Sequence, residues 1–153
     1  MDYARILPAL FVGSCPKQRE DIERLKRAAG ISAVLNLQTD SDMQHFSLDW
    51  ESLLSCYREL EIELRRLPVR DFDAADLEAK LPACVSSLAE LLSLNHTVYL
   101  HCSAGAGRSP TVAAAYLCVS FGWDLEAAIA HLQQCRPCAP NRAVLRALLA
   151  GRA

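Results

Sequence analysis

The sequence predicts an α/β fold in which a central sheet is flanked by helices on both faces. Two observations lead to this prediction. Short apolar segments alternate along the chain with longer amphipathic ones, which is typical of layered α/β domains. The chain has 153 residues, of which 52% are hydrophobic, and this is enough for one compact domain with its own core. We therefore expect a single domain over residues 1–153.

Four short segments have the apolar composition of strands. In order they are ALFVGS, ISAVLNLQ, IELRRLPV and TVYLH, at residues 9–14, 31–38, 62–69 and 97–101. Gly13 ends the first segment in a turn. The second is apolar and branched enough for a buried strand.

Six further segments have helical periodicity, at residues 17–30, 48–59, 77–94, 111–121, 124–135 and 141–150. In the first of these, Ile22 and Leu25 lie at helical spacing and Gly30 is a stop signal. Pro110 fits the first position of the fourth helix, because the N–H that proline lacks has no helical partner there. Asp124 is a plausible N-cap for the fifth.

Charge and composition argue against several functional classes. The net charge of −2 gives no reason to expect nucleic-acid binding. No apolar run approaches the ~20 residues of a membrane span, so we expect no membrane partner. No targeting segment is visible, neither a signal peptide nor a transit peptide, although a leader could have been removed. Seven scattered cysteines do not resemble a disulfide framework and favour a reducing compartment.

The cysteine pair of CRPC, Cys135 and Cys138, has the spacing of a redox motif. It follows a predicted helix instead of opening one after a strand, which disfavours a thioredoxin-like role. A zinc site would need a second pair of ligands, and none is evident at suitable spacing. We therefore expect neither a metal nor a cofactor.

The stretch HCSAGAGRSPT, residues 101–111, has the composition of an anion-binding loop. It follows a strand and precedes a helix, which places it at the carboxyl edge of the sheet, where α/β folds bind ligands. Gly105 and Gly107 let the backbone curl, so that N–H groups can point inward at a helix N-terminus. Arg108 adds a planar fork that suits two phosphate oxygens. The expected phosphate-binding loop consists of Ser103, Ala104, Gly105, Ala106, Gly107 and Arg108.

Cys102, at the base of this loop, is the expected nucleophile. The helix end and the loop N–H groups stabilise a thiolate, the reactive form of cysteine. A thiolate that faces a bound phosphate can attack it and form a phosphocysteine, while Arg108 and the amides bear the developing charge. Ser109 can donate a hydrogen bond to the sulfur when the sulfur becomes the leaving group, and His101 can order the loop from behind.

The reaction also needs an acid to protonate the leaving alkoxide and a base for the water step. The upstream loop VRDFDAAD offers Asp71, Asp73 and Asp76, and spacing alone does not choose among them. Two alternatives to catalysis are a buried structural cysteine, as we expect for Cys84 and Cys118, and a phosphate-binding domain without turnover. Because cysteine, arginine and acid all occur in the expected structural context, the sequence favours an enzyme.

At these residues the chain resembles the cysteine-dependent dual-specificity phosphatases, whose signature is His-Cys, five residues, Arg and then Ser or Thr. It is most similar to one branch, the plant starch-excess-type glucan phosphatases, with laforin a more distant relative. This branch favours Cys, a hydrophilic residue, Ala, Gly, an aliphatic residue, Gly and Arg, and CSAGAGR fits that pattern. Other matching segments are LFVGSCPKQREDIERLK, AVLNLQTDSDM, RDFDAADLEAKLP and CRPCAPNRAVLR. The resemblance covers the whole chain and implies the dual-specificity phosphatase fold, with a mixed, mostly parallel central sheet.

The resemblance also implies roles for particular residues. Asp71 would be the acid and base, because it precedes the phenylalanine of the family's DFD-like loop. Phe72 would line an aromatic channel for glucan, and Tyr3 and Phe46 match two further aromatics of the family. Sugars can pack their C–H faces on such rings, whereas ordinary core packing is the alternative for Tyr3 and Phe46. Some relatives have an aromatic residue where this chain has Ala139, which shortens the expected channel.

The implied function is that of a phosphoglucan phosphatase, which removes phosphate monoesters from amylopectin-like chains. The alternative is a protein phosphatase acting on phosphotyrosine and phosphothreonine. A phosphoinositide phosphatase usually carries lysines in this loop, and the loop has none. No carbohydrate-binding module is recognised in this chain. We expect a monomer that acts on phosphorylated glucan; the resemblance implies a chloroplast or other plastid, and the cytoplasm is the alternative.

Overall fold

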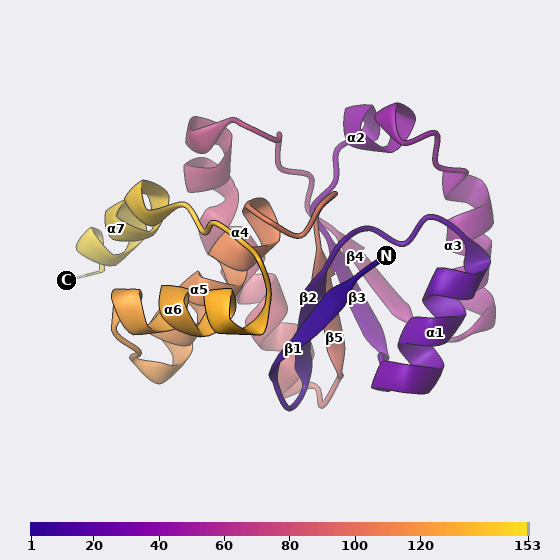
Figure 1. Cartoon of the computed structure of the whole chain (residues 1–153), viewed down its shortest axis with the longest axis horizontal. Coiled ribbons are helices and arrows are strands. Elements are labelled where there is room, and N and C mark those ends of the chain that lie inside the picture. The colour runs from indigo at the N-terminus through magenta and orange to yellow at the C-terminus, as the bar shows by residue number, and fades with distance from the viewer. Residues whose placement is uncertain (153) are drawn as a thin grey trace.

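The computed structural model describes residues 1–152 and confirms the α/β fold (Figure 1). The strands are β1 (Tyr3–Leu7), β2 (Leu10–Gly13), β3 (Ala33–Asn36), β4 (Glu63–Arg66) and β5 (Val98–His101). The helices are α1 (Arg19–Ala29), α2 (Asp40–His45), α3 (Trp50–Glu59), α4 (Ala74–Ser93), α5 (Arg108–Phe121), α6 (Leu125–Cys135) and α7 (Arg142–Ala150). Every strand and helix predicted from the sequence is present, and β1 and α2 are additional.

The strands form one sheet in the order β1-β2-β5-β3-β4. β1 pairs antiparallel with β2 at one edge, whereas the other pairs are parallel, so the sheet is mixed but mostly parallel, as expected. The register aligns Gly13 and Asn36 with His101, and Arg66 with Asn36. The carboxyl ends of four strands therefore lie at one level, and the segments that follow them meet at one edge of the sheet.

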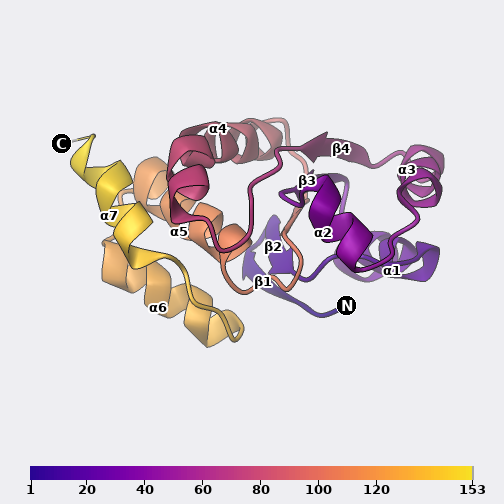
Figure 2. The same cartoon turned by 90° about the horizontal axis from the view of Figure 1, so that it is seen from above.

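Helices cover both faces of this sheet, with α1 and α3 on one side and α4 to α7 on the other (Figures 1 and 2). Side chains of β5 alternate between the two faces, as the pleat of a strand requires. Tyr99 belongs to the core formed with α1 and α3, whereas Val98 and Leu100 belong to the core formed with α4 to α7. Two hydrophobic cores thus fix the sheet from both sides.

Two helices begin earlier than the sequence predicts. The N–H of Thr111 donates to the carbonyl of Gly107 at 3.1 Å, so α5 begins at Arg108 and Pro110 is its third residue, not its first. Proline is tolerated there because the first four N–H groups of a helix have no helical partner. α4 begins at Ala74 and not near Leu77, because the carboxylate of Asp73 caps it.

The two additional elements have weak sequence signals. β1 is an edge strand of five residues in which Arg5 is exposed, so its apolar pattern is weak. α2 has six residues, too few for helical periodicity, and it is fixed instead by a capping box between Thr39 and Asp42. Among residues 1–152, no helix combines the length and apolar character that crossing a membrane would require.

Candidate active site

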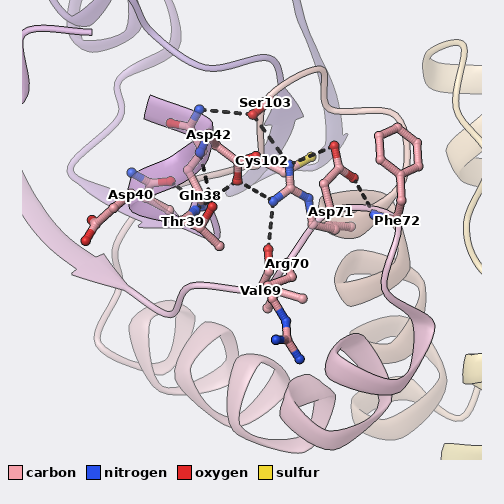
Figure 3. Close-up of polar contacts among 12 residues, drawn as sticks. Gln38, Thr39, Asp40, Asp42, Val69, Arg70, Asp71, Phe72, Cys102 and Ser103 are labelled. Carbon is pink, nitrogen blue, oxygen red and sulfur yellow. Dashed lines mark hydrogen bonds and ion pairs between the residues drawn. The ribbon is translucent and has the colours of Figure 1, made fainter. Parts of the chain in front are cut away.

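The predicted site residues other than Tyr3 meet at the carboxyl edge of the sheet, where three segments come together. The loop of residues 102–107 joins β5 to α5, the segment after β3 carries Gln38 and α2, and the segment after β4 carries Asp71 and Phe72. Side chains from all three segments lie together in Figure 3. A cavity of about 500 Å³ opens here, and Cys102, Asp71 and Arg108 are among its lining residues.

One glycine of the loop is required by its geometry. Gly105 has a φ of 69°, in the left-handed region, and a Cβ atom there would lie 2.4 Å from the backbone of Gly13. Both the conformation and the close approach to β2 therefore exclude a side chain. Gly107, at the N-cap of α5, has a φ of −124° and open space around it, so the steric argument does not extend to it.

Cys102 lies beneath the loop with only 3% of its surface exposed. Its Sγ lies 3.2 Å from the hydroxyl oxygen of Ser109, which stands on the first turn of α5. The Nδ1 of His101 lies 2.8 Å from the carbonyl oxygen of Cys102. Because a carbonyl only accepts, Nδ1 carries the proton and donates it. Burial, with a smaller effect of Arg108, lowers the pKa of His101 to about 4 against the opposing effect of that hydrogen bond, so the ring is neutral at pH 7.

Arg108 is the central polar group of the site and is only 4% exposed. Its Nη1 donates to the carboxylate of Asp42 at 2.6 Å and to the carbonyl of Val69 at 2.7 Å. Its Nη2 lies 3.2 Å from the carboxylate of Asp71 and 3.4 Å from the hydroxyl of Ser103. Figure 3 shows these contacts converging on one guanidinium group. Within residues 1–152, Nε is buried without a hydrogen-bond partner, so it is a free donor for a phosphate oxygen.

Asp42 fixes the direction of the arginine. Its carboxylate accepts from the N–H of Thr39 at 2.9 Å, within the capping box of α2, as well as from Arg108. Burial alone would raise the pKa of Asp42, but the hydrogen bonds and charge of Arg108, together with the Thr39 bonds, hold it below its usual range. Since Asp42 occupies Nη1, the Nε edge of Arg108 is left for a ligand.

The three candidate acids have different surroundings. Asp71 is 39% exposed at the cavity, and its Oδ2 lies 3.2 Å from Arg108. Asp73 caps α4 by accepting from the N–H of Asp76 at 2.9 Å. Asp76 itself pairs with Lys80 at 3.0 Å. Of the three, the structure brings Asp71 to Arg108, while Asp73 and Asp76 bond within the start of α4 and to Arg70.

The predicted aromatic residues do not form a single channel. Phe72 is fully exposed, and its φ of 56° is uncommon for a residue with a side chain. It lines the cavity of Cys102 and also an adjoining cavity of about 610 Å³, where Phe46 lies. Tyr3 instead packs edge-on against Phe11 and Tyr99, with ring centroids 6.0 Å apart in both pairs, and lines a different cavity. The structure therefore brings Phe46 and Phe72 together and leaves Tyr3 apart.

A family model described as "Dual specificity phosphatase, catalytic domain" matches residues 10–152. The chain belongs to this family. A solved structure of the family's fold, described as PTPMT1, aligns with a TM-score of 0.77 at 22% identity, covering 99% of this chain and 98% of that one. This likeness confirms the predicted dual-specificity phosphatase fold.

Curated relatives include phosphoglucan phosphatases of two plants. LSF1 of Arabidopsis thaliana, described as chloroplastic, is 36% identical over 142 residues, which cover 93% of this chain and 24% of LSF1. DSP4 of Castanea sativa, described as amyloplastic, is 38% identical over 143 residues, 92% of this chain and 38% of DSP4. Laforin of Mus musculus is 35% identical over 135 residues, 82% of this chain and 41% of laforin. These matches confirm the resemblance seen in the sequence, and the chain spans less than half the length of each of these relatives.

Three residues at this site were not singled out by sequence reasoning. Asp42 and Gln38 follow β3, a neighbour of β5 in the parallel sheet, so strand order would have brought them to the same edge. Gln38 donates to the hydroxyl of Ser103 at 3.1 Å. Arg136 lies within CRPC and contacts the loop from behind, and no sequence pattern indicated that contact. Among residues 1–152, no three His, Cys, Asp or Glu side chains are grouped as metal ligands.

Proposed function

We propose that this chain hydrolyses phosphate monoesters on glucan chains through a phosphocysteine intermediate. The observation that carries the proposal is the arrangement of a cysteine, an arginine and an acid around one cavity of about 500 Å³, namely Cys102, Arg108 and Asp71. The loop N–H groups and the free Nε of Arg108 suit the three outer oxygens of a phosphate held above Cys102.

In the first step, the thiolate of Cys102 attacks phosphorus. The S–P bond forms as the bond from phosphorus to the sugar oxygen breaks, and protonated Asp71 gives its proton to the leaving alkoxide. Arg108 and the loop amides stabilise the charge that develops on the phosphoryl oxygens.

In the second step, water attacks the phosphocysteine. Asp71, now a carboxylate, takes a proton from the water while the new P–O bond forms and the S–P bond breaks. The thiolate that leaves is stabilised by the hydroxyl of Ser109, whose oxygen lies 3.2 Å from the sulfur. Inorganic phosphate is released, and Asp71 is protonated again for the next cycle.

The surroundings of the cavity support a sugar-bearing substrate. Phe72 offers a fully exposed ring beside Asp71, and Phe46 adds a second ring, 37% exposed, in the adjoining cavity. Aromatic faces of this kind pack against the C–H faces of sugars. Relatives named phosphoglucan phosphatase favour the same substrate class. Tyr3 would contribute only if a long chain extended past the loop to the third cavity.

We also propose that the protein acts in a plastid, as a monomer with one catalytic domain over residues 1–153. The location is supported by the names of the two plant relatives, which are described as chloroplastic and amyloplastic. The single domain is supported by the family match over residues 10–152.

The decisive experiment compares phosphate release from solubilised phosphorylated amylopectin with release from a phosphotyrosine peptide at matched phosphate concentration. We expect a strong preference for amylopectin. A preference for the peptide would keep the roles of Cys102, Arg108 and Asp71 but would reject the glucan substrate, and the protein would then be a protein phosphatase.

A further inference from the structure

Arg136 lies behind the phosphate-binding loop and is 8% exposed. Its Nε donates to the carbonyl of Gly105 at 3.0 Å, and its Nη2 donates to the carbonyl of Ala104 at 3.2 Å. Nη1 donates to the carbonyl of Val12 in β2 at 3.2 Å, and Nη2 also pairs with the carboxylate of Asp2 at 2.8 Å. One buried guanidinium group thus joins the end of α6, the loop, β2 and the N-terminal segment.

The neighbouring carbonyls of the loop have backbone donors. The N–H of Cys15 donates to the carbonyl of Ser103 at 2.9 Å, and the N–H of Ala139 donates to the carbonyl of Ala106 at 2.7 Å. Among residues 1–152, Arg136 is the one side chain that donates to the carbonyls of residues 103–106. The middle of the loop therefore depends on a single side chain for its outward-facing acceptors.

These two bonds determine where two N–H groups point. A peptide unit is planar and trans, so its C=O and its N–H point in opposite directions. The carbonyls of Ala104 and Gly105 share their planes with the N–H groups of Gly105 and Ala106. When Arg136 holds those carbonyls outward, both N–H groups are held towards the side of the loop on which a phosphate would bind.

We propose that Arg136 is a positioning residue of the phosphate-binding loop: its planar fork orients the Gly105 and Ala106 amides towards the phosphate, and its charge adds to their attraction for the anion. This inference rests on the proposed function and extends it to a residue outside the cavity of Cys102. The partner carboxylate of Asp2 is 80% exposed, so solvent screens it more than it screens the guanidinium group. A lysine at this position would keep the charge but would lose the fork.

The test measures the binding of phosphate ion, which distinguishes an effect on the loop from an effect on overall stability. Calorimetry would measure the affinity of inorganic phosphate for Cys102→Ser protein, with and without Arg136→Met or Arg136→Lys. Turnover of an aryl phosphate would be measured in the same variants with Cys102 intact. Arg142→Met is the matched control, because Arg142 also makes two bonds of 2.8 Å, but to Glu126 on the surface.

We expect Arg136→Met to weaken phosphate binding at least tenfold and to lower kcat/KM for the aryl phosphate at least a hundredfold. Arg136→Lys should stay at least fivefold below the parent in phosphate affinity, since only the charge is kept. Arg142→Met should remain within twofold. Methylguanidinium should restore part of the activity of Arg136→Ala, because a cavity of about 480 Å³ reaches Arg136 from solvent, and it should not change Arg142→Ala.

Phosphate affinity within twofold of the parent in folded Arg136→Met protein would overturn the inference. If Arg136→Met does not melt cooperatively, Arg136→Lys decides by the same criterion. In the comparison with amylopectin, a preference for the phosphotyrosine peptide would reject the glucan substrate. It would not change the phosphate affinities measured in the Arg136 variants. Unchanged phosphate binding in the Arg136 variants would reject this inference and leave the proposed function standing.

Discussion

Replacing Asp42 by asparagine tests whether a charged pair fixes Arg108. The variant keeps the shape of the side chain and one oxygen acceptor but removes the negative charge that lies 2.6 Å from Nη1. A hydrogen bond to a charged group contributes about 1.5–3 kcal/mol to folding. The side chain of Asp42 is 15% exposed and Arg108 keeps Asp71 as a second carboxylate, so the loss should lie below the ~3–5 kcal/mol of a fully buried pair. We expect the free energy of unfolding to fall by about 2 kcal/mol at pH 7, or about 4–8 °C in Tm.

The pH dependence of this difference follows from the lowered pKa of Asp42. The folded protein holds the carboxylate charged below its unfolded pKa of about 3.9, so its stabilisation is fully present above that pH. As the pH falls through the lower folded-state pKa, the wild-type carboxyl group takes up a proton and the advantage over asparagine is lost. In thermal melts of both proteins from pH 7 to pH 3, the difference in Tm should therefore narrow once the pH falls below about 3.9.

Asp40→Asn is the control, because Asp40 lies on the same helix and forms a 2.7 Å ion pair with Arg66 but is 82% exposed. An exposed pair contributes about 0–1 kcal/mol, so this variant should shift Tm little at any pH. Equal shifts for the two variants, or a shift for Asp42→Asn that persists unchanged to pH 3, would refute the argument that Arg108 is held by a buried charge.

Four other substitutions test the site. Cys102→Ser should abolish turnover while phosphoglucan binding survives, and undiminished phosphate release would exclude the phosphocysteine. Asp71→Ala should lower kcat about 10²–10⁴-fold for sugar phosphates and much less for an aryl phosphate, whose leaving group needs no proton; equal losses on both substrates would move the acid role to another residue. Phe72→Ala should weaken glucan hydrolysis more than aryl phosphate hydrolysis, with unchanged Tm because the ring is fully exposed, and an equal loss on both would count against a sugar contact. Gly105→Ala should lower the free energy of unfolding by about 2–5 kcal/mol, because of the left-handed φ and the 2.4 Å approach to Gly13, and it should also reduce activity. A variant with normal stability in denaturant melts would show that the loop can relax.

The sequence was sufficient for the parts of the fold that depend on local signals. The buried strands β3 and β5 have continuous apolar runs. Asp124 is the N-cap of α6, as predicted, and its carboxylate accepts from the N–H of Ala127. Helix starts were less predictable, because α4 and α5 begin where particular backbone and side-chain bonds form. β1 was missed because its apolar pattern is weak, and α2 because six residues are too few to show periodicity; pairing with β2 and a capping box stabilise them instead.

The cysteine, the arginine and the loop could be located from the sequence, because they are adjacent along the chain and their chemistry is recognisable. The choice of Asp71 among three aspartates required the resemblance to the family. In the structure Asp71 lies 3.2 Å from Arg108, and its role as the acid stays a prediction. Asp42 and Arg136 could not be assigned from residue type alone, since an aspartate in a polar segment and an arginine near a helix end are usually solvated. Only the tertiary fold reveals that Arg136 is buried behind the loop and that Asp42 is partly buried against Arg108.

The difference between the residues that the sequence locates and those that only the fold reveals has a physical origin in the way the loop is held. A loop that points its N–H groups at a phosphate must point its carbonyls away from it, and those carbonyls then need donors from outside the loop. The donors come instead from Cys15 after β2, from Arg136 at the end of α6 and from Ala139 beyond it. Each belongs to a segment distant in sequence, so the seven residues from Cys102 to Arg108 specify the chemistry but not the conformation that performs it. The same dependence predicts that loop geometry is lost when α6 or the N-terminal segment is displaced, even though neither lines the cavity of Cys102.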